Sequence, residues 1–347
     1  MKIKTIIFFI LIIGLAGIFF LNIYSYSTPI RSNNTMSNEK TFSQKVPVIP
    51  SPITPQKSQN EKISTETSQN SNTASKIPAT STSNSNPTLT KPEMSKSNSG
   101  TVFLENFNTT YSVSEADKLI DRTSPGWWLG SGAYFYSAQG IGSTLVGKLR
   151  AGDPFRIAYS TSNPIDTDNG YYPQNIFRLV LTRGKWLNFQ QEADFKMVNN
   201  NLSNSPNRNE SNGLLFFNRY QDADNLYYTG IRVDGAAVIK KKINGTYYEL
   251  SLNQFYKNSI YNRETNPNLI PKNKWIGLKS EIKTNPDNTV NIKLFIDKDM
   301  TGDWVLATEA TDDGKSYGGP AILDAGYTGF RTDFMDVEFD NYKVVQE

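Results

Sequence analysis

Short apolar runs with a period of two dominate the chain after Gly100 and constrain its fold more than any other feature. They occupy residues 177–181, 214–220, 276–282 and 290–296. Alternation of apolar and polar residues is typical of strands with one buried face, and Asp-Gly and Asn-Gly turn sequences separate the runs. Many short strands at such spacing predict an all-β fold, a two-sheet antiparallel sandwich. Only residues 114–121 carry the N-terminal signature of a short helix.

Composition divides the chain into three parts, residues 1–27, 28–100 and 101–347. Ser, Thr, Asn, Pro, Lys and Gln dominate residues 28–100, where Phe42 is the only aromatic residue. Such a segment cannot bury enough apolar surface to fold, so we predict a disordered linker. A peptide ligand or a glycosylated stalk is the alternative for this part. All five tryptophans lie in residues 101–347, which is enough chain for one sizeable core.

The N-terminus predicts export. Lys2 and Lys4 precede an almost uninterrupted apolar run at residues 6–24, which is long enough to cross a bilayer as a single helix with its N-terminus in the cytoplasm. The predicted location is therefore the cell membrane, with residues 6–24 in the lipid bilayer and the C-terminal domain outside. A cleavable signal ending near residues 25–27 is the alternative, and it predicts a secreted protein.

The chain contains no Cys and no His. Disulfides, the usual serine and cysteine triads and histidine-ligated zinc hydrolases are therefore excluded. Residues 101–347 hold 26 basic and 29 acidic residues, a net charge of about −3. This charge gives no support for nucleic-acid binding.

Two stretches resemble strands of the concanavalin A-like lectin/glucanase superfamily, which includes laminin-G-like modules. Residues 213–232 resemble a pair of neighbouring strands in those jelly rolls, and residues 326–333 with 339–344 resemble their closing strands. The resemblance covers most of residues 101–347 and implies a jelly-roll sandwich. It specifies architecture better than chemistry, because this superfamily holds lectins, glycosidases and polysaccharide lyases.

The same resemblance implies a structural calcium ion. In related jelly rolls an aspartate of the last strand, here Asp340, holds calcium with groups of the first strand, here Glu105 and Asn106. Calcium suits a site with oxygen ligands only. A strand-capping or solvent-facing role for Asp340 is the alternative. The acidic stretch at residues 297–303 lacks the carboxylate of a calcium loop at its twelfth position, and we predict a hairpin turn there.

Catalytic candidates come from the resemblance to polysaccharide lyases, which can use tyrosine as base and acid while cations neutralise a uronate. The weak candidates for such a role are Arg219, Tyr228, Arg232 and Lys240. Strand alternation puts Tyr228 and Arg232 on one face, and likewise Lys240 and Lys242. The Gln-Ile-His motif of alginate lyases is absent. A glycosidase would need paired acids, for which residues 336–340 offer three carboxylates on one strand face.

Sugar recognition favours aromatic rings flanked by amides and charges. Trp127 and Trp128 are candidates for an aromatic platform, since one of two neighbouring strand residues points away from the core. We predict that Trp186, Trp275 and Trp304 lie in the core. The leading hypothesis is a membrane-tethered, non-catalytic carbohydrate-binding domain that uses Trp127 and Trp128 together with the four lyase candidates. A histidine-free lyase or glycoside hydrolase is one alternative, and a structural or adhesive envelope module is another.

Overall fold

The computed structural model describes Gly100 and residues 102–347. The predicted membrane segment and nearly all of the predicted linker lie outside the described residues. In the part of the chain that is described, no helix has the length and apolar character needed to span a bilayer.

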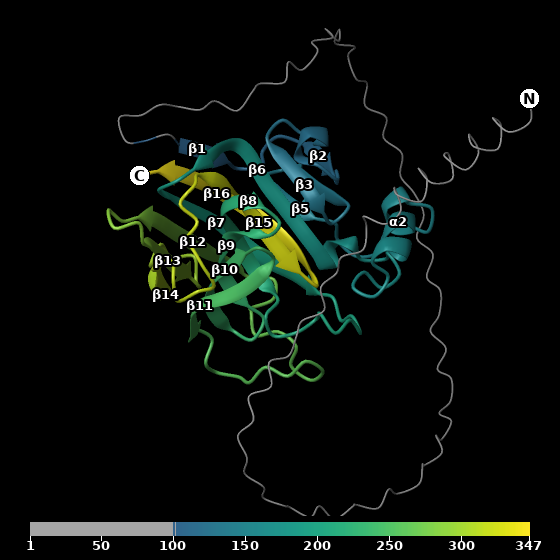
Figure 1. Cartoon of the computed structure of the whole chain (residues 1–347). Coiled ribbons are helices and arrows are strands. Elements are labelled where there is room, and N and C mark those ends of the chain that lie inside the picture. Colours follow the sequence, from purple (N-terminus) through teal and green to yellow (C-terminus); the bar gives the residue numbers. More distant parts are fainter. Residues whose placement is uncertain (1–99, 101) are drawn as a thin grey trace, which may run out of the picture. The chain divides into compact units, whose positions relative to one another are not determined.

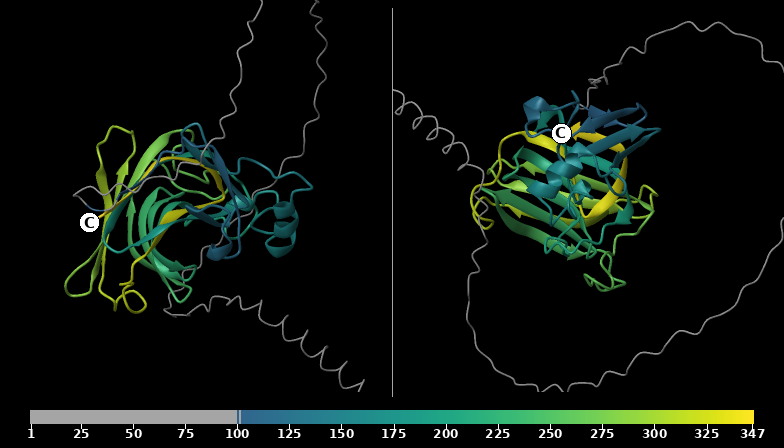
Figure 2. Two further views of the ribbon diagram at one scale, coloured as in Figure 1. Left: turned by 90° about the horizontal axis from the view of Figure 1, so that it is seen from above. Right: turned by 90° about the vertical axis from the view of Figure 1, so that its right-hand side faces the viewer.

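Two curved antiparallel sheets pack face to face (Figures 1 and 2), which confirms the predicted two-sheet sandwich. The seven-stranded sheet has the spatial order β11 (Thr246–Gln254), β10 (Ala236–Ile243), β9 (Asn225–Arg232), β8 (Gly213–Asp222), β15 (Gly326–Asp333), β6 (Ile176–Trp186) and β3 (Trp127–Ser131).

The nine-stranded sheet has the order β14 (Val305–Asp312), β13 (Val290–Asp297), β12 (Trp275–Thr284), β7 (Phe189–Asn200), β16 (Met335–Gln346), β5 (Ile141–Thr144), β4 (Tyr134–Ala138) and β2 (Tyr111–Ser114), while β1 (Val102–Glu105) also pairs with β16. The first and last described strands are therefore neighbours, and their pairing ties the two ends of the described domain together.

Helical structure is sparse. The predicted helix at residues 114–121 is only a single 3-10 turn, η1 (Leu119–Asp121), because β2 extends to the start of that stretch. The α-helix of the domain is instead α2 (Pro154–Ser162), where Asp153 caps the N-terminus by accepting a hydrogen bond from the Phe155 amide. A second 3-10 turn, η2 (Pro173–Asn175), leads into β6.

Aromatic rings fill the space between the sheets. Trp127 lies at the centre of this core, with its ring centroid 6.0 Å from that of Phe330 and 5.7 Å from that of Tyr342. Phe330 also stacks on Phe339 at 4.8 Å. Without cysteines, the fold depends on this burial, and each large ring removes 150–250 Å² of surface from water. Trp186 is buried as predicted.

Trp275 and Trp304 are only partly buried, contrary to the prediction. On β12, Ile276 and Leu278 point into the core, so Trp275 and Gly277 face outward. Trp304 covers Gly277, where a Cβ atom would come within 2.8 Å of its ring. After Trp275 the buried run begins one residue later than the sequence pattern indicates, and after Trp304 the first buried residue is Ala307.

A buried ion pair joins the two sheets. Lys241 on β10 and Asp312 on β14 have no exposed side-chain surface, and their Nζ and Oδ2 atoms lie 2.8 Å apart. The Tyr227 hydroxyl donates to the same oxygen at 2.6 Å. Burial, followed by this hydrogen bond to Asp312, raises the pKa of Tyr227. The pair fixes which face of β10 points inward.

Two hairpin turns are built in the same way, and the one predicted at residues 297–303 is confirmed. In the turn between β8 and β9, Asp222 accepts hydrogen bonds from the Asp224 amide and the Asn225 side chain. In the turn between β13 and β14, Asp297 accepts from the amides of Thr301 and Gly302. Asx side chains thus stabilise both turns locally.

Candidate functional site

The outer face of the seven-stranded sheet carries a groove. Strand alternation sends Tyr227 and Ile231 into the core and leaves Tyr228 and Arg232 on the outer face of β9. On β10, Lys240 and Lys242 share this outer face, and Lys240 pairs directly with Tyr228. The sequence alternation therefore predicts the shared face of these residues correctly.

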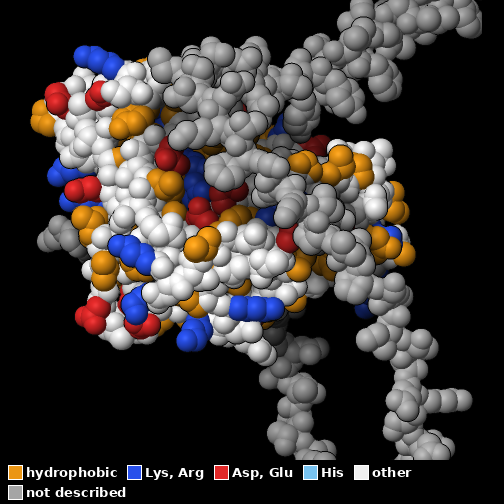
Figure 3. Space-filling view, turned by 90° about the horizontal axis from the view of Figure 1, so that it is seen from below, with side chains coloured by type: hydrophobic (Ala, Val, Ile, Leu, Met, Phe, Trp, Pro, Cys, Tyr) orange, Lys and Arg blue, Asp and Glu red, His pale blue; other side chains and the backbone are white. Residues whose placement is uncertain are grey.

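The groove encloses a cavity of about 410 Å³, within the range of about 300–1,000 Å³ that is typical of small-ligand sites. Its floor comes from six strands and consists mainly of Arg178, Leu215, Tyr228, Lys240, Tyr247, Arg331 and Asp333. Its wall comes from the loops before β6 and β8 and consists of Asp166, Asn175, Asn207, Asn209, Ser211 and Asn212. Figure 3 shows a hollowed face in which basic and acidic side chains lie together.

Arg331 connects the groove floor across several strands. Its Nε atom donates to Asp333 Oδ2 at 2.8 Å, and its Nη1 atom donates to the Tyr247 hydroxyl at 3.1 Å. The guanidinium carbon lies 5.2 Å from the centre of the Tyr228 ring. Burial disfavours the charge of Arg331, but Asp333 and the two tyrosines outweigh burial and raise its pKa. Arg331 is therefore a permanent cation in the floor.

The two tyrosines of the floor differ in character. Tyr228 is only 3% exposed, and burial raises the pKa of its hydroxyl. Tyr247 is 48% exposed. Burial acts to raise the pKa of Tyr247, but the positive charges of Arg331 and Lys242 outweigh it, so this pKa lies below the usual value. Tyr247 therefore presents both an accessible ring and the more acidic hydroxyl.

Lys240 lies in the floor beside Tyr228. Among residues 102–347, its amine forms no ion pair and no hydrogen bond. Burial lowers its pKa, and the positive charges of Arg232 and Arg331 lower it further, against an opposing contribution from Glu249.

Arg232 shares the outer face but does not line the groove. Its guanidinium contacts Asp234 at 2.7 Å and Glu249 at 3.7 Å, and its Nε atom donates to the Glu210 carbonyl at 3.1 Å. Because these contacts occupy its donors, Arg232 acts mainly as a source of positive charge near Lys240.

Arg219 does not join the other candidates. The pairing of β8 and β9 becomes irregular after Asn218, and Arg219 has a left-handed backbone with φ of 49°. Together these two features turn the Arg219 side chain into the interior. The side chain is fully buried and donates to the carbonyls of Leu187 and Ile322 and to Thr284. Burial lowers the pKa of Arg219 to about 10. Its role is to hold loops together between the sheets.

The two adjacent tryptophans lie on opposite faces of β3. Trp127 is a core residue and is not accessible to a ligand. Trp128 lies partly buried on the outer face, edge-on to Tyr220 at 6.3 Å, and its indole N–H donates to the Ala116 carbonyl at 2.7 Å. Trp128 thus borders the face that carries the groove without lining the cavity itself.

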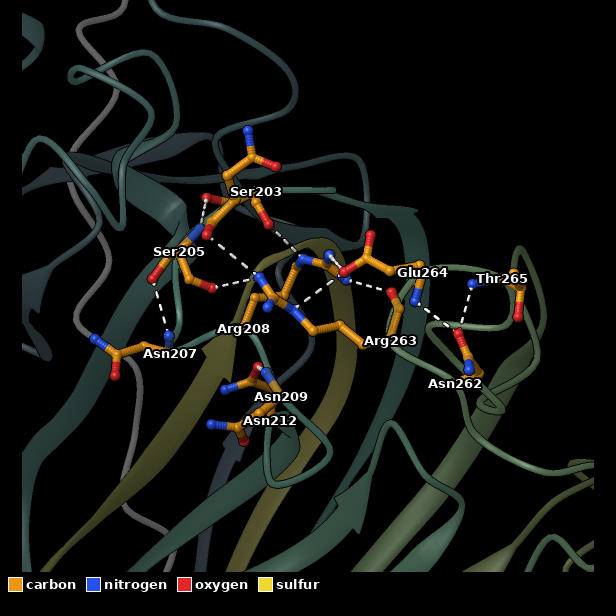
Figure 4. Close-up of polar contacts among 11 residues, drawn as sticks. Ser203, Ser205, Asn207, Arg208, Asn209, Asn212, Asn262, Arg263, Glu264 and Thr265 are labelled. Carbon is orange, nitrogen blue, oxygen red and sulfur yellow. Dashed lines mark hydrogen bonds and ion pairs between the residues drawn. The ribbon is translucent and has the colours of Figure 1, made fainter. Parts of the chain in front are cut away.

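The groove wall is held by a network that sequence periodicity cannot reveal. Arg208 is 6% exposed and donates to the carbonyls of Ser203 at 2.5 Å and Arg263 at 2.8 Å (Figure 4). Arg263 in turn donates to the Ser205 carbonyl at 2.9 Å. These contacts join two loops, and one of the two loops carries the asparagines of the wall.

The predicted calcium ligands already have local partners. Glu105 accepts hydrogen bonds from the Phe107 amide and the Tyr111 hydroxyl, and the Asp340 carboxylate accepts from the Asn341 amide. In the described part of the chain, no three acidic side chains cluster as a metal site. These carboxylates would have to exchange partners to bind a metal, so calcium stays a prediction.

The acids of residues 336–340 lie on β16 of the nine-stranded sheet, not on the sheet that carries the groove. Asp336 is buried and accepts hydrogen bonds from Gln174, Asn201 and the Gly147 amide. Glu338 forms an ion pair with Lys196. These acids therefore do not act on a ligand held in the groove.

Comparison with known proteins gives structural likeness only. No family model and no curated protein matches the chain. The carbohydrate-binding module CBM66 from Bacillus subtilis is similar over 64% of this chain and 96% of its own, with 13% identity and a TM-score of 0.35. A Bacillus subtilis protein of unknown function with a galectin-like fold is similar over 70% of this chain and 94% of its own, with 11% identity and a TM-score of 0.39.

An alginate lyase mutant in complex with an alginate tetrasaccharide is similar over 71% of this chain and 97% of its own, with 10% identity and a TM-score of 0.33. Identities and TM-scores of this size do not transfer a function to this chain.

Proposed function

We propose that the described domain is a non-catalytic carbohydrate-binding domain that holds a glycan in the groove of the seven-stranded sheet. The observation that carries this proposal is the composition of the groove. An accessible ring at Tyr247, cations at Lys240 and Arg331 and a wall of asparagines meet in one cavity. Pyranose faces stack on aromatic rings, while amides and charges bond to hydroxyl groups.

The full-length chain should be tested on a glycan array. We expect binding to a restricted group of polysaccharides, and Tyr247→Ala should weaken it because the variant removes the accessible ring. Absence of binding to any glycan would favour the structural or adhesive module instead. Thermal unfolding of the variant provides the control for folding.

A lyase is the second candidate, favoured by the lowered pKa of Tyr247 beside Arg331. In this reaction the Tyr247 phenolate takes the proton on the carbon next to a uronate carboxylate, and Arg331 neutralises that carboxylate. A carbon–carbon double bond forms as the glycosidic carbon–oxygen bond breaks, and the departing oxygen takes a proton. Ultraviolet absorbance of the unsaturated product after incubation with uronate polymers tests this activity.

Membrane tethering through residues 6–24 is part of the same proposal, with secretion as its alternative. The support is the apolar run of the sequence. Fractionation of cells that express the full chain should find it in the membrane fraction. Recovery from the medium without residues 1–27 would establish secretion.

A further inference from the structure

The charges of the groove floor are not balanced. Arg178, Arg331 and Lys240 line the cavity, and Asp333 is the carboxylate that lies among them on the floor. Asp333 Oδ2 lies 2.8 Å from Arg331, and Asp333 Oδ1 lies 3.9 Å from Arg178. One carboxylate therefore serves two guanidinium groups, and Lys240 adds a third positive charge.

The neighbouring carboxylates are engaged elsewhere. Glu249 pairs with Lys240 along the strand ladder, but its side chain is 46% exposed and its carboxylate lies near Arg232. Asp166 belongs to the wall, where Ser205 and Asn207 donate hydrogen bonds to it. Neither carboxylate forms an ion pair with Lys240, so the floor keeps a surplus of positive charge.

Shielding makes this surplus effective. Lys240 is partly buried, its cross-strand neighbours are the nearly buried Tyr228 and Glu249, and the positive charges of Arg232 and Arg331 act on it. Charges in such surroundings are screened less by water and salt than charges on an open surface. An anionic group that enters the cavity would relieve the repulsion between Lys240 and the guanidinium groups of Arg232 and Arg331.

We infer that the groove selects acidic glycans, which carry a carboxylate or sulfate group, and that Lys240 is the residue that determines this selection. The inference rests on the proposed function, because it names the chemical class of the glycan in the same groove. Arg331 supports the selection as a second cation, but its Asp333 and Tyr247 contacts also shape the floor. Lys240 is the cleaner target for substitution because it makes no such contacts.

Lys283 provides the control. It is an exposed lysine on β12 of the nine-stranded sheet and does not line the groove. Lys242 is unsuitable, because its amine lies 5.1 Å from the centre of the Tyr247 ring. Lys240→Gln and Lys283→Gln remove the same charge from the domain, so any difference between the two variants reports position rather than net charge.

The experiment measures binding of full-length wild type and of both variants by titration calorimetry. The probes are polygalacturonate and its carboxyl-reduced form, and dextran sulfate and unmodified dextran. For wild type, we expect tighter binding to at least one acidic polymer than to its neutral partner, with a difference that shrinks as salt is added. Lys240→Gln should weaken acidic binding about tenfold or more, and Lys283→Gln should leave it within about twofold.

The two acidic probes separate carboxylate from sulfate as the recognised group. Equal affinity for acidic and neutral partners, or no binding to either acidic polymer, would overturn the inference. So would equal effects of the two lysine variants. Failure of the whole protein to bind any glycan on the array would instead overturn the proposed function, so the two failures are distinguishable. Matching melting temperatures of the variants confirm that both are folded.

Discussion

Replacing Asp312 with asparagine should lower the free energy of unfolding by about 3–5 kcal/mol, the range measured when one partner of a buried ion pair is removed. The side chains of Lys241 and Asp312 have no exposed surface, and their charged atoms lie 2.8 Å apart. After the substitution, Lys241 keeps its contacts with the carbonyls of Gly319 and Pro320 but loses the opposing charge. An uncompensated buried ammonium group causes the loss.

The matched control is a pair whose lysine lies on the same strand and whose carboxylate lies in the exposed turn between β8 and β9. Lys242 and Asp224 lie 3.0 Å apart, but the Asp224 side chain is 62% exposed. Such surface pairs contribute about 0–1 kcal/mol, so Asp224→Asn should change stability by no more than that. The contrast between the two asparagine variants isolates the effect of burial.

The assay is unfolding in urea, with the free energy obtained by linear extrapolation. A double variant, Lys241→Met with Asp312→Leu, removes both charges and should cost less than the single Asp312→Asn substitution, because no charge is left buried. If Asp312→Asn and Asp224→Asn cost the same, the reasoning is refuted.

This pair also matters for the groove. Neighbouring strand residues face opposite sides, so a slip of one position would exchange Lys240 and Lys241 between the groove and the interior. Because Lys241 is held by Asp312 of the opposite sheet, Lys240 is held outward. Loss of the ion pair should therefore weaken ligand binding as well as stability.

Three further predictions concern the core, the groove and the calcium hypothesis. Trp127→Ala should lower the free energy of unfolding in urea by about 3–5 kcal/mol, whereas Trp128→Ala should cost less because its ring borders solvent; equal costs would contradict the assigned faces. Ultraviolet titration should show a tyrosine that ionises below the usual pKa of about 10. Arg331→Gln should raise the pKa of this tyrosine, since the variant removes the charge that stabilises the Tyr247 phenolate. An unchanged titration would contradict the role of Arg331 in lowering the pKa. Calcium should raise the melting temperature and Asp340→Asn should abolish the increase; identical melting curves with calcium and with a chelator would exclude the site.

Strand alternation predicted much of the architecture and part of the site. It placed Tyr228 and Arg232 on one face and Lys240 and Lys242 on one face, because two-residue periodicity holds wherever a ladder is regular. It failed at Arg219, where a left-handed residue reverses the direction of the side chain. A non-glycine residue with positive φ leaves no mark in the hydrophobic pattern.

Other parts of the site had weaker signals. Arg331 follows the core residue Phe330 directly, so strand alternation indicates that Arg331 points outward. From the sequence, this stretch was interpreted only as a fold signature. The amide wall has no periodicity at all. Its position depends on Arg208 and Arg263, whose contacts join loops about 55 residues apart in sequence. Such contacts become visible only in three dimensions.

The most direct test of the central claim compares the two outer faces of the sandwich. Tyr247 lies in the groove of the seven-stranded sheet, and Trp275 lies on the outer face of the nine-stranded sheet. For any glycan that the protein binds, Tyr247→Ala should weaken binding about tenfold, and Trp275→Ala should leave it unchanged. Loss of binding in Trp275→Ala with full binding in Tyr247→Ala would contradict the account.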